Sequence, residues 1–160
     1  MFFVSNLKHI IHLEPEKLGP ECMDILRKTL TSSVEGTCSG EYGYIISVLS
    51  IDKIGSGRIT NNGYAVFSVH YQALVLKPLK GEIIDASIVE TNDMGIFAGV
   101  GPLTIFISNY QIPKMLLKGS EGGGLEKNSN IRLKIIGTKV EATRIYAIGT
   151  INEYYLGLIC

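Results

Sequence analysis

Apolar and polar residues alternate along residues 64–77, which is the clearest pattern in the chain. One side of the pattern is apolar and aromatic: Phe67, Val69, Tyr71, Ala73 and Val75. The intervening positions are mostly polar. Successive side chains of a strand point to opposite faces of its sheet. The alternation therefore predicts an antiparallel strand with one buried face.

Two further elements precede that strand. Residues 2–14 alternate in the same way and predict another strand. Pro20 suits the first position of a helix, and Met23, Leu26 and Leu30 follow at helical spacing. We therefore expect one amphipathic helix over residues 21–32, with those three side chains in the core.

Glycines divide the next stretch into short strands at 34–38 and 42–52, followed by a turn-rich loop to Gly63. The first half of the chain is thus predicted to be α+β, a small sheet with one helix packed on it. We expect no other helix in the chain.

Pro78 marks a change of character, because the rest of the sequence reads as strands. They are expected at 81–91, 95–100, 103–108, 130–136 and 144–151. A polar loop at 114–129, expected to be mobile around Gly122, Gly123 and Gly124, separates the third from the fourth. Five short strands with this long connection outline an OB barrel, although periodicity alone fits another small barrel equally well. The predicted domains are residues 1–78 and 79–160.

Composition narrows the classes of function. The net charge is zero and charged residues make up 19 % of the chain, which argues against a protein that holds long duplex nucleic acid. Hydrophobic residues make up 46 %, so we expect a partner to cover part of the surface. No apolar run approaches the ~20 residues that span a bilayer, and we expect an intracellular, soluble protein.

The three cysteines, Cys22, Cys38 and Cys160, form no CxxC pair and are odd in number. They predict neither a structural zinc site nor a disulfide framework, and they favour a reducing compartment. The carboxylates Asp85, Glu90 and Asp93 lack a neighbouring histidine or nucleophile. We expect no catalytic residues, no metal and no cofactor.

Six segments, spread in order over almost the whole chain, carry a resemblance to a known family. They are EGTCSGEYGYIISV (35–48), IDKIGSG (51–57), KPLKGEIIDA (77–86), GIFAGVGPLTIFIS (95–108), IRLKIIGTKV (131–140) and IYAIGTINEYYLGLI (145–159). With them the chain resembles the stalk subunit of eukaryotic RNA polymerase II, the seventh-largest subunit family, whose counterpart in archaeal RNA polymerase is the E-prime polypeptide.

The resemblance implies an N-terminal RNP-like tip domain and a C-terminal S1-type OB domain. It also implies a nuclear, non-catalytic subunit that pairs with a second, smaller stalk subunit. Such a heterodimer would dock on the core enzyme, support transcription initiation and bind emerging single-stranded RNA. The alternatives are a free S1-type RNA-binding protein and, less in keeping with the residues, a nuclease on an OB scaffold.

The glycine-containing loop at 53–63 has three interpretations. A phosphate cradle would need a following helix or a Lys-Ser/Thr pair, and the sequence shows neither. A plain hairpin connection is the second. The resemblance implies the third, a polymerase-docking tip in which Gly55 and Gly57 allow close backbone approach and Ile54 and Ile59 are apolar anchors.

Aromatic residues are the first candidates for RNA contact. Phe97 and Phe106 fall on the second and third strands of the expected barrel, where they would either stack on bases or belong to the core. Tyr110, at the end of the third strand, is expected to be exposed.

Basic residues are the second candidates. Period two places Arg132 and Lys134 on the polar face of the fourth strand. Together with Lys139 they would form a basic stripe for phosphates, joined by Lys80 and Arg144, or else simply be scattered surface charges.

Overall fold

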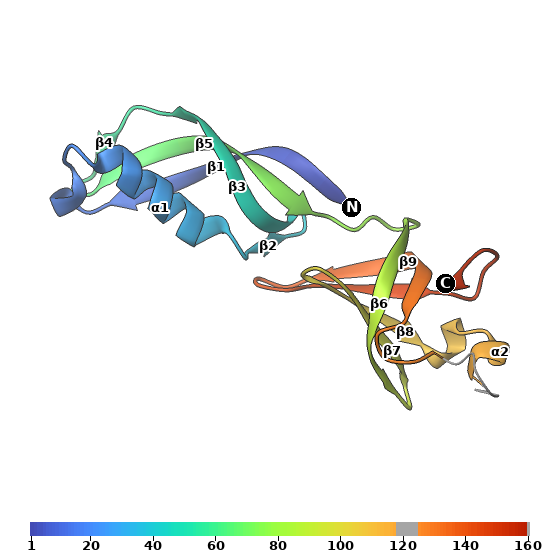
Figure 1. The fold of residues 1–160 in the computed structure, drawn as a ribbon. Coiled ribbons are helices and arrows are strands. Elements are labelled where there is room, and N and C mark those ends of the chain that lie inside the picture. The colour runs from blue at the N-terminus through green and yellow to red at the C-terminus, as the bar shows by residue number, and fades with distance from the viewer. Residues whose placement is uncertain (118–124, 160) are drawn as a thin grey trace. The chain divides into compact units, whose positions relative to one another are not determined.

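The structure is a computed structural model that describes residues 1–117 and 125–159 of the chain (Figure 1). The chain divides into two compact units, Phe2–Leu76 and Lys77–Cys160, the second of which includes Met1. Each unit has its own sheet and its own buried apolar residues.

The N-terminal unit is an antiparallel sheet in the order β1-β5-β3-β2, with the short β4 also paired to β5. Its strands are β1 (Phe2–Leu13), β2 (Cys38–Ser39), β3 (Gly43–Ile54), β4 (Arg58–Ile59) and β5 (Ala65–Leu76). A one-turn 3-10 helix, η1 (Pro15–Lys17), and the helix α1 (Cys22–Val34) connect β1 to β2. The predicted α+β character is confirmed.

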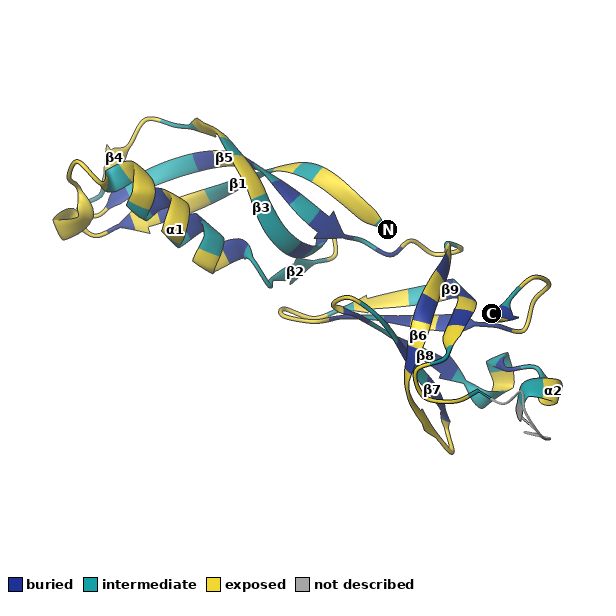
Figure 2. Ribbon diagram, in the orientation of Figure 1, coloured by how far each residue is buried: buried dark blue, intermediate teal, exposed yellow. Residues whose placement is uncertain are grey.

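Helix α1 covers one face of this sheet, and the core lies between them (Figure 2). Its buried stripe is Leu26, Leu30 and Val34, packed with Ile11, Leu13 and the inward face of β5. Val69, Tyr71, Ala73 and Val75 form that face, as the alternation predicted.

One core prediction was wrong, because Met23 is 60 % exposed. The buried stripe follows a spacing of four from Cys22 through Leu26 and Leu30 to Val34, which leaves Met23 on the flank of the helix. The helix also runs two residues beyond its predicted end and takes Val34 from the strand predicted there.

The C-terminal unit is a closed barrel in the order β10-β8-β7-β6-β9, with β9 also paired to β10. Its strands are β6 (Ile83–Asn92), β7 (Gly95–Val100), β8 (Leu103–Ser108), β9 (Asn130–Val140) and β10 (Ile145–Thr150). The β8–β10 pair is parallel and the other pairs are antiparallel. This pairing closes the predicted OB barrel, and a two-residue strand, β11 (Gly157–Leu158), extends it beyond β9.

The connection after β8 differs from the predicted loop. It contains a 3-10 turn, η2 (Asn109–Gln111), and a one-turn helix, α2 (Lys114–Leu117), although we expected no helix there. Ser108 caps η2 by accepting a hydrogen bond from the backbone of Tyr110, 3.3 Å away. The expectation of mobility around Gly122, Gly123 and Gly124 lies outside the described residues.

Strict alternation fills the barrel interior with aliphatic side chains. The buried side chains of the five strands are Ile84, Ala86, Ile88, Ile96, Ala98, Leu103, Ile105, Ile107, Ile131, Leu133, Ile135, Ile145 and Ala147. Side chains at the intervening positions of β7, β8 and β10 must therefore point outward. Among the described residues, no helix is long and apolar enough to cross a membrane.

Candidate functional site

An aromatic and aliphatic row crosses the outer face of β7, β8 and β10. Phe97 is paired directly with Phe106, with ring centroids 5.1 Å apart and ring planes tilted by 45°. Ile148 lies beside Phe106 in the parallel register and is 52 % exposed. Because each of the three alternates with buried neighbours, the row is outside the barrel core. We call Phe97, Phe106 and Ile148 the stacking platform.

Gly95 allows β7 and β8 to approach closely beside this platform. A Cβ atom at Gly95 would collide with the carbonyl oxygen of Ile107 and would lie 3.1 Å from Cε2 of the Phe106 ring. Any larger residue would therefore push the two strands apart or displace the ring.

Polar groups border the platform along the next row of the sheet. Thr104 lies beside Tyr146, and Tyr146 is opposite Lys139. Directly opposed residues share a face of the sheet, so Lys139 belongs to the platform side. Arg144 is a second cation here. A hydrogen bond and an electrostatic interaction with Tyr146, and then the charge of Glu141, raise its pKa. Lys139 itself has an exposed partner, Glu141, at 3.5 Å.

Arg132 and Lys134 lie elsewhere, on the part of β9 that pairs with β6. Arg132 donates from Nε to Oδ1 of Asp85 at 2.8 Å and from Nη2 to Oδ2 at 3.2 Å. This bond lowers the pKa of Asp85. Lys134 Nζ lies 3.2 Å from a carboxylate oxygen of Glu153. Arg132, Lys134 and Lys139, three of the five cations predicted as one stripe, are thus divided between two parts of β9, and each of the three has a carboxylate partner.

Tyr110 is presented by η2 and is 92 % exposed. It borders an open hollow of about 980 Å³, which also takes in Phe106, Lys114 and Asn152. Asn109 stabilises this rim by donating a hydrogen bond from its side chain to the backbone carbonyl of Asp93. The hollow connects Tyr110 to the edge of the stacking platform.

The four residues predicted to dock on a polymerase lie at the end of β3, in the connection that follows it and in β4, and their exposure differs. Ile59 is 71 % exposed, whereas Ile54 is half-buried against the core of its own unit. A Cβ at Gly55 would lie 3.2 Å from the carbonyl oxygen of Ser68, and one at Gly57 only 2.6 Å from the Phe67 ring. Both glycines therefore have a packing role within the sheet, and Ile59 is the apolar side chain of this set that the fold presents to solvent.

The described residues do not form a metal centre. Within 1–117 and 125–159, no group of three or more His, Cys, Asp or Glu side chains is placed to hold a metal ion. Cys22 and Cys38 are unpaired and half-buried.

Sequence reasoning missed Ile148 as a member of the stacking platform and Tyr146 as its neighbour. The run Ile-Tyr-Ala-Ile at 145–148 does show that the two share a face. Their position beside Thr104 and Phe106 depends on the parallel β8–β10 pairing, which joins residues about forty positions apart in the sequence and has no local sequence signal.

Comparisons with known proteins cover both units. Residues 8–65 match the SHS2 domain found in the N terminus of Rpb7p, Rpc25p and MJ0397, and residues 77–147 match the S1 RNA binding domain.

Several relatives that match over nearly the full chain are named as subunits of RNA polymerase II. DNA-directed RNA polymerase II subunit rpb7 of Dictyostelium discoideum is 42 % identical, over 99 % of this chain and 99 % of its own length. The protein of the same name from Schizosaccharomyces pombe is also 42 % identical, again over 99 % of both chains. The Saccharomyces cerevisiae counterpart is 38 % identical, over 99 % of this chain and 100 % of its own.

Proposed function

This chain belongs to the Rpb7 family of DNA-directed RNA polymerase II subunits, and we propose that it works there as a stalk subunit that docks on the core enzyme and binds nascent single-stranded RNA. The stacking platform is the observation that supports RNA binding, because Phe97 and Phe106 lie on the outer face of the barrel and not in its core.

The binding mechanism is weak and tolerant of sequence. Stacking of a base on an aromatic ring is worth ~1–3 kcal/mol and works for every base. Few cations lie near the platform, Lys139 and Arg144 being the two beside Tyr146. Attachment to the polymerase would supply the missing affinity, since a tethered site meets its ligand at high effective concentration.

The N-terminal unit supplies the docking function in this proposal. Ile59 and the loop around it would contact the core enzyme, and a second, smaller stalk subunit would complete a heterodimer. We place the complex in the nucleus, in keeping with the relatives' assignment to polymerase II. The chain itself would have no active site.

A free S1-type RNA-binding protein was the alternative. It is not favoured, because the match to polymerase subunits covers the N-terminal unit as well as the barrel. A protein that shared only the S1 barrel with this family would not show that.

Purification from the source cells tests the proposal. A tagged copy of the chain should recover the polymerase II core and the smaller stalk protein in equal amounts, and ultraviolet cross-linking should label the tagged chain with nascent RNA. Recovery of the chain free of polymerase subunits would contradict the docking role, while recovery with polymerase but without cross-linked RNA would contradict the RNA role.

A further inference from the structure

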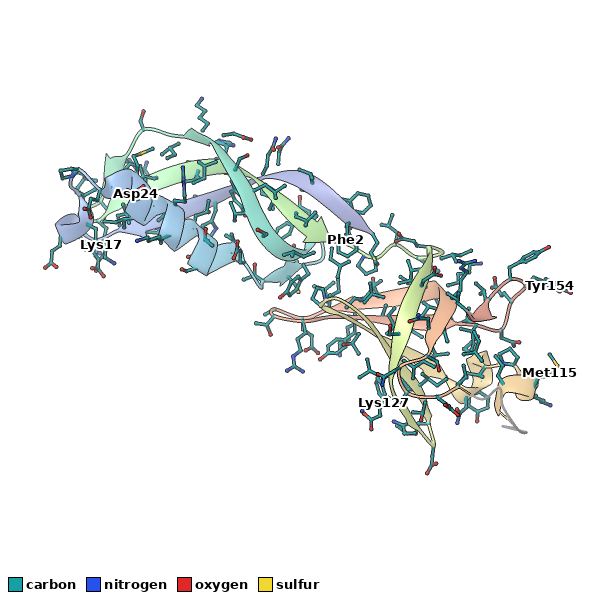
Figure 3. All side chains as sticks on the ribbon, in the orientation of Figure 1. Phe2, Lys17, Asp24, Met115, Lys127 and Tyr154 are labelled. Atoms are coloured by element: carbon teal, nitrogen blue, oxygen red, sulfur yellow. The ribbon has the colours of Figure 1, made fainter. Side chains whose placement is uncertain are left out.

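Two neighbouring tyrosines in the turn between β10 and β11 are almost fully exposed. Tyr154 is 93 % and Tyr155 96 % exposed. Figure 3 shows Tyr154 projecting away from the ribbon of the barrel. Each ring leaves a large apolar area in contact with water. Small polar residues in the same turn would not expose such an area.

The backbone of this turn holds Tyr155 in an unfavourable conformation. The turn closes where Leu156 N donates to Glu153 O at 3.4 Å, and Tyr155 is its third residue, with φ at 65°. Glycine or asparagine normally occupies such a position, and a bulky residue there is strained. Strain of this kind is retained mainly where a side chain has a function.

Local contacts fix the turn without using either ring. Glu153 is tied to β9 by Lys134, and the backbone N–H of Asn152 donates to Thr150 Oγ1 at 3.2 Å. The rings therefore contribute nothing evident to the shape of the turn, and their exposure needs a reason outside the fold.

A second hollow joins Tyr154 to the surface already described, and Tyr155 follows it in the same turn. It has a volume of about 630 Å³ and is lined by Pro113, Asn152, Glu153 and Tyr154. Pro113 and Asn152 also line the larger hollow that includes Phe106 and Tyr110. The two hollows therefore adjoin at Pro113 and Asn152, one of them reaching Phe106 and Tyr110 and the other Tyr154.

We propose that Tyr154 and Tyr155 form an aromatic ledge on which two further bases of the single-stranded RNA stack beyond the platform. The inference rests on the proposed function, because it extends the same RNA path. Aromatic faces suit any base, and the amide of Asn152 stands between the two hollows, where it can hydrogen-bond a base edge. Lys134 offsets the charge of Glu153, so the ledge does not repel phosphate strongly.

An RNA length series on the full chain tests the ledge. Fluorescence polarisation would compare oligouridylates of about 4 and about 12 nucleotides, both within the range of about 4–16 that one OB fold occupies. The parent should bind the longer RNA more tightly. The double variant Tyr154→Ala/Tyr155→Ala should keep its affinity for the short RNA, whereas its affinity for the long one should fall by about thirtyfold or more, since two stacked bases are lost. Tyr154→Phe/Tyr155→Phe should match the parent, as should Tyr64→Ala in the other unit.

The variant Tyr155→Gly separates a binding role from a structural one. Glycine removes the strain at this positive φ, so the melting temperature should rise. The affinity for the long RNA should nevertheless fall. If the Tyr155 ring served only the fold, the melting temperature and the RNA affinity of Tyr155→Gly would change in the same direction. That result would overturn the proposal.

The remaining outcomes also decide the matter. Equal length dependence in the parent and in Tyr154→Ala/Tyr155→Ala would overturn the ledge while leaving the platform intact. Loss of heterodimer assembly with unchanged RNA affinity would show that the tyrosines contact a protein instead. If the parent binds neither RNA, the RNA-binding function fails, and the ledge fails with it.

Discussion

The two units of this chain expose apolar side chains on different architectures, an open sheet and a closed barrel. The N-terminal sheet is open, and α1 covers only one of its faces. Val4 and Ile10 of β1 alternate with the residues that face the helix, and both are exposed, as is Leu49 of β3. The barrel closes on itself, so its interior is complete, and what it exposes includes aromatic rings next to polar groups.

This difference indicates a division of labour. Exposed aliphatic side chains on an open sheet are typical of a surface that another protein covers. Exposed rings beside hydroxyl, amide and basic groups are suited to stacked bases and phosphates. The comparison predicts that changes in the first unit affect assembly and that changes in the second affect RNA binding.

The largest effects should come from truncating the two cores. Leu30→Ala in the N-terminal unit and Leu133→Ala in the barrel each remove a fully buried side chain, and each should cost about 2–5 kcal/mol of unfolding free energy. Hydrogen exchange read peptide by peptide should show each loss confined to its own unit. Faster exchange in the barrel of Leu30→Ala would mean that the two units unfold together.

Removing the platform should have the next largest effect. Phe97→Ala/Phe106→Ala eliminates two rings, and loss of stacking at ~1–3 kcal/mol per base predicts at least a tenfold weaker RNA complex. Polarisation titration would measure it, and Tyr64→Ala is the control from the other unit. Unchanged affinity would show that RNA binds on another face.

Docking should respond to a charge at the exposed end of the N-terminal unit. Ile59→Asp removes an apolar side chain whose burial is worth ~1.5–3 kcal/mol, so binding to the core polymerase should weaken by roughly tenfold or more. The matched control is Ile83→Asp, because Ile83 is a similarly exposed isoleucine of the barrel. A pull-down in which both variants behave alike would remove the distinction between the units.

Local patterns predicted most of the fold, since β7 and β8 have the bounds that the alternation indicated. The position and type of helix α1 were predicted, but its buried stripe begins at Cys22 and not at Met23 as predicted. Both residues are acceptable on an apolar face, and only packing against the sheet selects between them. The short helix α2 has a single turn, too short for periodicity to reveal.

The site was less predictable than the fold. Phe97 and Phe106 could be proposed from their strands, but whether they faced inward depended on which alternate set filled the barrel. The ion pairs of Arg132 and Lys134 join residues far apart in the sequence. Their charges could therefore be counted from the sequence, while their carboxylate partners could not be identified.

Releasing one of those cations should change the salt dependence of RNA binding. Asp85→Asn removes the partner of Arg132 on the barrel surface. If RNA reaches this part of β9, the freed guanidinium can hold one more phosphate, and the slope of log K against log salt should steepen by about 0.7. An unchanged slope in a salt titration would place the RNA path entirely on the β7–β8–β10 side.

The smallest predicted effect is a difference in acid sensitivity between the units. Burial lowers the pKa of His9 on β1 from its ordinary 6.5, so the unfolded chain takes up a proton there first as the pH falls. The resulting stability is fully present above pH 6.5 and is lost as the pH falls through the lowered value. In the barrel, the hydrogen bond from Arg132 lowers the pKa of Asp85 from 3.8, so its contribution is lost only below that pH. Peptide-level exchange along a pH series, corrected for the intrinsic exchange rate, should therefore show the N-terminal unit loosening first. The variant His9→Gln should remove that early loss, and a barrel that loosened first would reverse the order expected from these two groups.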